Sequence, residues 1–246
     1  MEDKLFCKYV FYGADTYTGG VMNKEQYTVI EKYMLVCMED SAHDKEHIYR
    51  VLYNAILLAK SEEDVNYDVL ITACLLHDIG RKEQYENSEL CHAVVGADKA
   101  FRFLINNGFD LNFAEKVKEC IRSHRYRKTT PPQSIEAKIL FDADKLDVVG
   151  AIGIARTLLY QGIVSDPLYT VLPDGTISDG TNDTSPSFFY EYKYKLENLY
   201  SGFYTEKAAS IALERKKIAS DFYYGLYDEV NSSYETGRKL LETIVI

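Results

Sequence analysis

Apolar residues recur at three- and four-residue steps along most of the chain, which is the period of an amphipathic α-helix. The clearest example covers residues 48–59, and Ser41 followed by Asp44 resembles a capping box at its start. A second helix is predicted over residues 65–79. It is apolar almost all round, so we expect it to be central and buried, with Gly80 as its C-terminal stop.

The same period continues in the rest of the chain, whereas the alternating pattern of strands is scarce. Further helices are predicted at about 89–107, 112–124, 134–161, 186–200 and 205–230, with a last one reaching the C-terminus. The exception is 163–185, a polar, glycine-containing loop in which residues 172–177 fit a short hairpin. A loop of this length is typical of a lid, a substrate-facing excursion or a disordered insertion.

These elements predict one all-α domain, a single helical bundle that covers residues 23–246 and includes C-terminal helices. Residues 1–22 are predicted to be an N-terminal extension. Neither internal repeats nor a linker divides the chain. With 246 residues and 46% apolar composition, the chain can bury a proper core.

Charge and cysteine content narrow the class of protein. The formal net charge of −10 argues against a nucleic-acid polymer or a membrane surface as partner, since both favour a basic protein. The net charge is compatible with a small anionic substrate bound in a locally basic pocket. The five cysteines lack CxxC pairing, and neither a signal peptide nor an apolar run of membrane-spanning length is found. We therefore expect free thiols and a soluble, cytoplasmic protein.

All five histidines fall between residues 43 and 124, on or next to predicted helices. A lone helical histidine is more often a satisfied core residue than a ligand, but clustering shifts that balance. The five positions are His43, His47, His77, His92 and His124.

The pair His77–Asp78 ends the most apolar helix, in the segment "LLHDIGR". A carboxylate in apolar surroundings costs several kcal/mol unless a positive group meets it. Asp78 could pair with Arg81 three residues later, or cap a helix end, or bind a metal ion. The residues of this segment alone leave all three alternatives open.

A second acidic segment, "FDADKLD", separates its aspartates by helical geometry. Asp142 is expected on a polar face between Lys138 and Lys145, whereas Asp144 has apolar neighbours at four-residue steps and should point inward. Two inward aspartates need a cation. Two histidines and two aspartates from three helices form a mixed nitrogen and oxygen site for a divalent ion, with coordination positions left open for water and substrate.

The ordered set "HIYRV", "LLHDIGRK" and "FDADKLDVVGAIGIAR", followed by "SFFYEYKYKLENLYSGFYTEKAASIALER", resembles the HD superfamily of metal-dependent phosphohydrolases, in its small stand-alone bacterial branch. The resemblance covers about residues 23–230. It implies an all-α HD domain with one divalent metal (Mn²⁺, Mg²⁺, Fe²⁺, Ni²⁺, Co²⁺ or Zn²⁺). The implied ligands are His47, His77, Asp78 and Asp144.

The resemblance also implies the chemistry, which is hydrolysis of a phosphate ester or anhydride by metal-activated water. Asp78 is expected to orient or deprotonate that water. His43 is a candidate for proton transfer or for supporting the metal ligands, and a surface histidine at a helix start is an equal alternative.

Basic residues beside the predicted ligands are candidates for binding phosphate: Arg81, Lys82, Lys145 and Arg156. Lys145 is favoured, because related enzymes commonly use a lysine just after the last aspartate. His92 and His124 are spaced as in the HD-GYP branch, where similar histidines hold a second metal. Arg125 stands where that branch has another histidine, and no GYP follows. We therefore expect these two histidines to line the pocket and contact substrate or water.

The leading substrate is a nucleotide, a nucleoside triphosphate cleaved to monophosphate and pyrophosphate. A nucleotidase and a cyclic-nucleotide or alarmone phosphodiesterase are the alternatives within the enzyme class. A regulatory module that binds metal and nucleotide without turnover, and a structural helical adaptor, are the alternatives outside it. The tyrosine-rich segment 188–227 is interpreted as packing of C-terminal helices or as a homodimer face.

Overall fold

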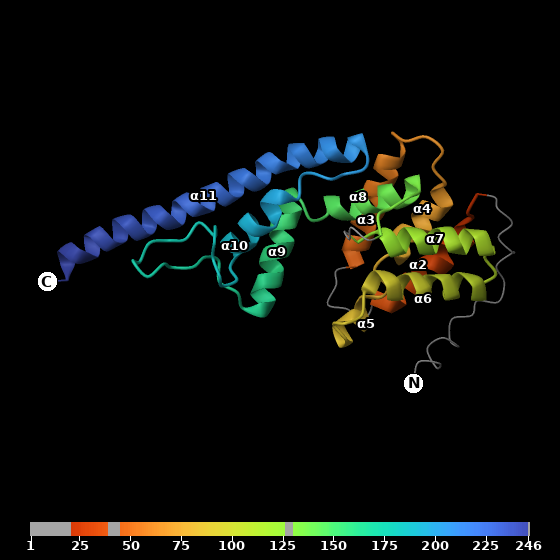
Figure 1. The fold of residues 1–246 in the computed structure, drawn as a ribbon, viewed down its shortest axis with the longest axis horizontal. Helices are drawn as coiled ribbons and strands as arrows, with labels where there is room; N and C mark the ends of the chain where they lie inside the picture. The colour runs from red at the N-terminus through yellow and green to blue at the C-terminus, as the bar shows by residue number, and fades with distance from the viewer. Residues whose placement is uncertain (1–20, 39–44, 126–129, 246) are drawn as a thin grey trace. The chain divides into compact units, whose positions relative to one another are not determined.

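The computed structural model describes residues 21–38, 45–125 and 130–245, and regular secondary structure in these ranges is helical (Figure 1). The all-α prediction is confirmed. The helices in chain order are α2 (Lys24–Met38), α3 (Lys45–Ala59), α4 (Tyr67–Leu76), α5 (Arg81–Glu86), α6 (His92–Asn106), α7 (Leu111–Ser123), α8 (Ile135–Leu146), α9 (Gly150–Val164), α10 (Phe188–Tyr194), the 3₁₀ helix η1 (Leu196–Asn198) and α11 (Glu206–Ile244).

The chain forms two compact units, Met1–Asp144 and Lys145–Ile246. The first holds α2 to α7 and most of α8, and the second holds α9 to α11. The assignment of 23–246 to one domain, with 1–22 as an extension, stays a prediction.

Helix α4 is the centre of the first unit and packs against α2, α3, α6 and α7. Its residues from Asp68 to Leu76 are buried except Ile71, as expected for a helix that is apolar almost all round. The Asn66 side chain caps the helix by accepting a hydrogen bond from the Val69 amide. The central, buried helix is therefore where the sequence places it, although it is shorter at both ends.

Helix α2 is absent from the predicted set. It begins with a reciprocal capping box, in which Asn23 and Gln26 each accept the other's backbone amide at 2.9 Å. Its buried face is a narrow stripe of Gln26, Ile30, Met34 and Met38. A stripe only one residue wide gives a weak periodic signal, which explains why the pattern misses it.

The helix predicted over 134–161 is two helices, α8 and α9. Helix α8 ends at Leu146 and α9 begins at Gly150, whose φ of +71° is a left-handed conformation that favours glycine. A Cβ on Gly153 would lie 2.3 Å from the Val148 carbonyl oxygen, so the chain returns tightly on itself here. Conversely, the two helices predicted after residue 205 are one continuous helix, α11.

The loop 163–185 packs within the second unit. Its turn at 172–177 has a single antiparallel bridge, Val171–Ile177, and not a paired strand ladder. The Tyr223 hydroxyl on α11 donates a hydrogen bond to the Asp179 carbonyl, and Arg238 donates one to the Gly175 carbonyl. The hairpin prediction thus holds for the turn alone.

No single helix among the described residues has the length and apolarity needed to cross a bilayer, and only α8 and α9 taken together pass that test.

Candidate active site

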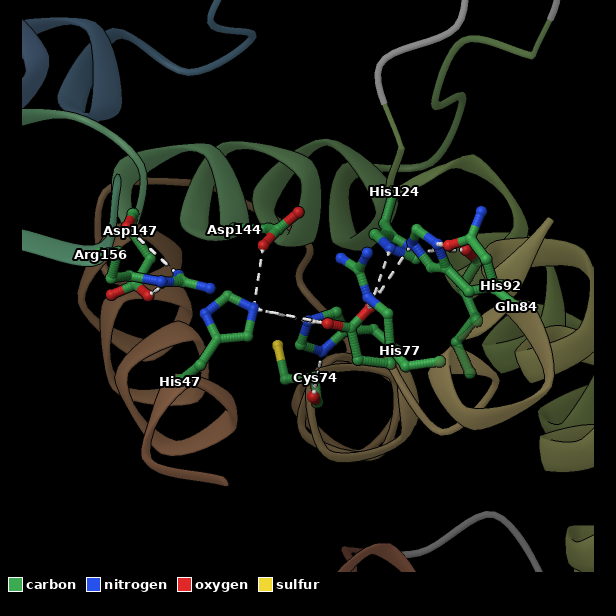
Figure 2. Close-up of polar contacts among 12 residues, drawn as sticks. His47, Cys74, His77, Gln84, His92, His124, Asp144, Asp147 and Arg156 are labelled. Atoms are coloured by element: carbon green, nitrogen blue, oxygen red, sulfur yellow. Dashed lines mark hydrogen bonds and ion pairs between the residues drawn. The ribbon is translucent and has the colours of Figure 1, made fainter. Parts of the chain in front are cut away.

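The Asp78 carboxylate lies between two pairs of imidazoles. Figure 2 labels the four histidines, His47 and His77 in one pair and His92 and His124 in the other. Its Oδ2 is 3.6 Å from His47 Nε2 and 3.7 Å from His77 Nε2. Its Oδ1 is 3.6 Å from both His92 Nε2 and His124 Nε2. Asp78 is only 1% exposed. Four nitrogen atoms from separate parts of the first unit therefore converge on one buried carboxylate.

Helix ends bring these groups together. His77 caps the C-terminus of α4, His124 caps that of α7, and His92 opens α6. His47 comes from the first turn of α3. Because each of these helices packs against α4 or a neighbour of α4, the central helix fixes the position of the site.

Asp144 joins this cluster through His47, with Asp144 Oδ1 3.3 Å from His47 Nε2. Its helix α8 is attached to the start of α4, since Glu136 accepts the Asn66 amide at 2.8 Å. The Asp144 side chain is 23% exposed, so it faces the site from a partly open side.

The expectation for Asp142 was wrong. Asp142 is fully buried, because α8 is buried on more than one face. Its residues Ile139, Leu140, Ala143 and Leu146 are fully buried as well.

Hydrogen bonds on the far side of the rings set which nitrogen carries the proton. His77 Nδ1 lies 2.7 Å from the Cys74 carbonyl oxygen, and His124 Nδ1 lies 2.6 Å from that of Ile121. A carbonyl only accepts, so the proton is on Nδ1 and the Nε2 lone pair of a neutral ring faces Asp78. Metal-binding histidines are oriented in this way, with the second nitrogen donating to a carbonyl.

Burial favours the neutral form of His77 and His92, and nearby positive charge favours an ionised Asp78. Burial lowers the pKa of His77 to about 4, and burial together with the positive charge of Arg81 lowers the pKa of His92 to about 3. Burial opposes ionisation of Asp78, but His77, His124 and Arg81 hold its pKa well below the ordinary value. At His124 the effect of burial is outweighed by the negative charge of Asp78 nearby, which raises the pKa of the ring.

Lone pairs that face a carboxylate repel it unless a cation lies between them. Two groups of ligand atoms, each within 4.8 Å of one another, are placed to hold one: His47, His77 and Asp78 on one side, and Asp78, His92 and His124 on the other. His92 Nε2 and His124 Nε2 are buried without a hydrogen-bond partner in the described structure. Imidazole and carboxylate ligands together suit a divalent transition metal. The residues present therefore fit the metal that the sequence implies.

Comparison with known proteins agrees with this geometry. The family model for the HD domain matches residues 45–149. A solved structure of a predicted HD superfamily hydrolase from an uncultured Thermotogales bacterium is 30% identical, with a TM-score of 0.54, and the alignment covers 84% of this chain and 92% of that one. The chain belongs to the HD superfamily.

A second relative is YpgQ of Bacillus subtilis, which is 26% identical over 196 residues, or 78% of this chain and 86% of YpgQ. The structure of YpgQ in complex with ADP matches with a TM-score of 0.65 at 25% identity and covers 83% of this chain and 98% of that one. Together with the structural neighbours called hydrolases, these findings support a metal-dependent hydrolase.

Three of the cations predicted to bind phosphate, Arg81, Lys145 and Arg156, form hydrogen bonds or ion pairs with other residues of the protein. Arg81 Nε donates to Asp78 Oδ1 at 2.9 Å, so the simple pairing considered for Asp78 is present beside the histidines. Lys145 Nζ donates to the Ser201 carbonyl at 2.6 Å and Arg156 pairs with Asp147. Lys82 is half-buried on α5. His43 lies outside the described residues.

Gly80, the glycine of the HD motif, serves a different purpose from the one predicted. Its φ of −95° is open to any residue, so it is not a left-handed helix stop. A Cβ there would lie 2.3 Å from the His92 carbonyl oxygen and 2.6 Å from the Gly96 amide nitrogen. The glycine therefore lets α6 approach the turn after Asp78 closely enough to bring His92 to the carboxylate.

Lys99 also supports this turn and was not predicted. From α6, its Nζ donates to the Ile79 carbonyl at 2.8 Å and to Glu83 Oε1 at 2.6 Å. The only sequence signal was a lysine at i+3 from Gly96 and i+7 from His92, which ordinarily marks a solvated helix position.

Replacing Lys99 with methionine is expected to lower the free energy of unfolding by about 2 kcal/mol, because the Ile79 carbonyl and Glu83 lose a charged donor in a largely buried place. Denaturant unfolding measures the change. Lys118→Met is the matched control, since the Lys118–Asp98 pair is more exposed and should change stability by less than about 1 kcal/mol. Equal effects of the two substitutions would contradict a special role for Lys99.

Proposed function

We propose that this HD-domain protein is a nucleotide phosphohydrolase that cleaves a nucleoside triphosphate to the monophosphate and pyrophosphate. The observation that carries the proposal is the buried Asp78 carboxylate between two pairs of imidazole nitrogens. Support for a nucleotide comes from YpgQ, whose structure was solved in complex with ADP. We assign His47, His77, Asp78 and Asp144 as the ligands of one divalent metal ion.

When bound, such an ion lowers the pKa of a coordinated water and offsets charge on phosphoryl oxygens. In the proposed reaction a water oxygen attacks the α-phosphorus, the bond from that phosphorus to the bridging oxygen breaks, and pyrophosphate leaves with the electron pair, while the proton of the attacking water is released to the solvent. Because its neighbours hold the pKa of Asp78 well below the ordinary value, Asp78 is a weak base. We therefore assign it to orienting the water by accepting a hydrogen bond, and not to removing its proton.

Binding of the phosphate groups is assigned to Arg81 and Lys82 on α5, next to the HD pair, and to Lys145. The Lys145 ammonium now donates to two neutral carbonyls, of Ser201 and Gly202. A phosphate oxygen carries negative charge that a backbone carbonyl lacks, so the ammonium is attracted to it more strongly and an exchange of partners on substrate binding is favourable.

The state of the cysteines is consistent with a protein of a reducing compartment such as the cytoplasm. The cysteines within the described residues, Cys37, Cys74, Cys91 and Cys120, are free thiols. We propose a cytoplasmic enzyme that acts on a small phosphorylated substrate.

The test combines metal analysis of the purified protein with a substrate panel. Each of the six divalent ions named above is supplied with nucleoside tri-, di- and monophosphates, a cyclic nucleotide and an alarmone, and the products are separated. The expected result is pyrophosphate and nucleoside monophosphate in equal amounts, only with metal present. Release of inorganic phosphate alone would favour a nucleotidase. Metal and nucleotide binding without turnover would replace the proposal by a regulatory module.

Removal of the metal is expected to lower thermal stability, because the imidazoles of His47 and His77 would then face the Asp78 carboxylate without a cation. A ligand at 100 times its dissociation constant stabilises the folded state by about 2.7 kcal/mol. Thermal unfolding before and after chelation, and after return of Mn²⁺, measures the difference. If the unfolding midpoint of the metal-free protein equals that of the protein supplied with each of the six ions, the proposed metal site is contradicted.

A further inference from the structure

The side chain of Gln84 contacts the histidine cluster, and the proposed function gives it no role. It lies on α5, and its Oε1 is 2.6 Å from Nδ1 of His92 (Figure 2). His77 and His124 use backbone carbonyls of their own helices for the same purpose. A backbone carbonyl comes with the helix, whereas the partner of His92 depends on one side chain.

The contact determines what His92 is able to bind. With the amide oxygen as acceptor, the proton of the neutral ring is on Nδ1 and Nε2 carries a lone pair. Nε2 is buried, has no hydrogen-bond partner in the described structure and lies 3.6 Å from Asp78 Oδ1. The opposite amide orientation would put the proton on Nε2, where 3.6 Å is too long for a hydrogen bond to Asp78. That orientation would leave a buried N–H without an acceptor, which native structures rarely do.

A lone pair on Nε2 excludes one partner and selects another. A phosphoryl oxygen brings no proton, so it cannot bind to a nitrogen that only accepts. An electron-pair acceptor is able to bind there, either a water proton or a divalent cation. His92 was expected to contact substrate or water. The lone pair on Nε2 excludes a phosphoryl oxygen of the substrate and leaves a water molecule or a divalent cation as the partner.

The geometry points to Gln84 as a positioning residue: it fixes His92 in the Nδ1–H tautomer, so that the Nε2 lone pair on the Oδ1 side of Asp78 receives an electron-pair acceptor in the catalytic complex. The inference deepens the proposed function and rests on it for its catalytic consequence. The tautomer itself is independent of any activity.

The decisive measurement is therefore made on the metal-free, substrate-free protein. Long-range ¹H–¹⁵N correlation spectra of the imidazoles distinguish an Nδ1–H from an Nε2–H ring, and a His92→Gln spectrum identifies the His92 signals. The wild type and Gln84→Glu are expected to show the Nδ1–H form, since both keep an acceptor oxygen. Gln84→Leu is expected to lose it. An Nε2–H ring in the wild type, or a tautomer unaffected by Gln84→Leu, would overturn the inference even in an active hydrolase.

Activity assays and metal titration measure how the loss of this tautomer affects catalysis and metal binding. Gln84→Leu should lower kcat by 10- to 100-fold, the usual effect of losing a residue that orients a metal-site histidine, and Gln84→Glu should restore most of it. Gln133→Leu is the control, because Gln133 is exposed and its side chain donates a hydrogen bond to the Pro131 carbonyl of the same loop. Loss of one bound Mn²⁺ per chain in Gln84→Leu would identify a cation as the acceptor, and unchanged stoichiometry with lower kcat would identify water. An unchanged kcat with unchanged stoichiometry would refute the catalytic role.

Discussion

Replacement of Asp78 with asparagine is expected to remove metal binding and to lower hydrolysis by about a thousandfold or more. The substitution keeps the shape of the side chain but removes the charge on which four imidazole nitrogens converge. A metal ion contributes several kcal/mol to stabilising the charge of a transition state, and about 4 kcal/mol corresponds to a thousandfold in rate. Metal content and single-turnover hydrolysis measure the two losses.

The protein should remain folded and helical in this variant. Arg81, which loses its partner, is 27% exposed in its side chain and is able to reach water. Asp98→Asn is the matched control, because Asp98 is a half-exposed carboxylate in a surface ion pair, and we expect neither metal content nor rate to change. Retained turnover in Asp78→Asn would remove both the metal assignment and the proposed mechanism.

The second large effect is expected from Gly80→Ala. Its methyl group would meet the His92 carbonyl oxygen at 2.3 Å and the Gly96 amide nitrogen at 2.6 Å, and both are backbone atoms that cannot rotate away. Overpacking of this kind costs about 3 kcal/mol. Helix α6 must move, and His92 moves with it, so we expect loss of stability and of activity together.

Urea unfolding and the substrate assay measure these losses. Gly225→Ala is the matched control, since Gly225 lies within α11 and an added Cβ there has nothing within 4 Å. Alanine in a helix interior is favoured over glycine by up to about 1 kcal/mol, so this control should be neutral or stabilising. A Gly80→Ala protein as stable as the wild type would show that the contact between α6 and the turn is not restrictive.

The arrangement around Asp78 gives its two carboxylate oxygens different surroundings. Oδ2 faces His47 and His77, whereas Oδ1 faces His92 and His124 and accepts a hydrogen bond from Arg81. A single carboxylate thus connects the predicted metal ligands to the two histidines that were expected to line the pocket and contact substrate or water. This connection makes the orientation of His92 by Gln84 matter for the whole site.

The sequence by itself determined the features that depend on neighbours along the chain. The three- and four-residue spacing of apolar residues was enough to predict α3, α4, α6 and α7, and the family was recognisable from "LLHDIGR" and "DADKLD". The same local reasoning failed at Asp142, because a helical wheel assumes one buried face and α8 is enclosed on more than one. It also joined α8 to α9, since the apolar periodicity continues across the break at residues 147–149.

Only the tertiary structure decided what depends on contacts between distant segments. Glycine at position 80 was read as a helix stop, yet the atoms that require it belong to His92 and Gly96 on another helix. Gln84 and Lys99 carry no recognisable pattern, because their roles exist only once α5, α6 and the turn after Asp78 are packed together. The spacing of residues along the chain predicts the direction in which a side chain points from its own helix. The packing of separate helices decides which residues that side chain contacts.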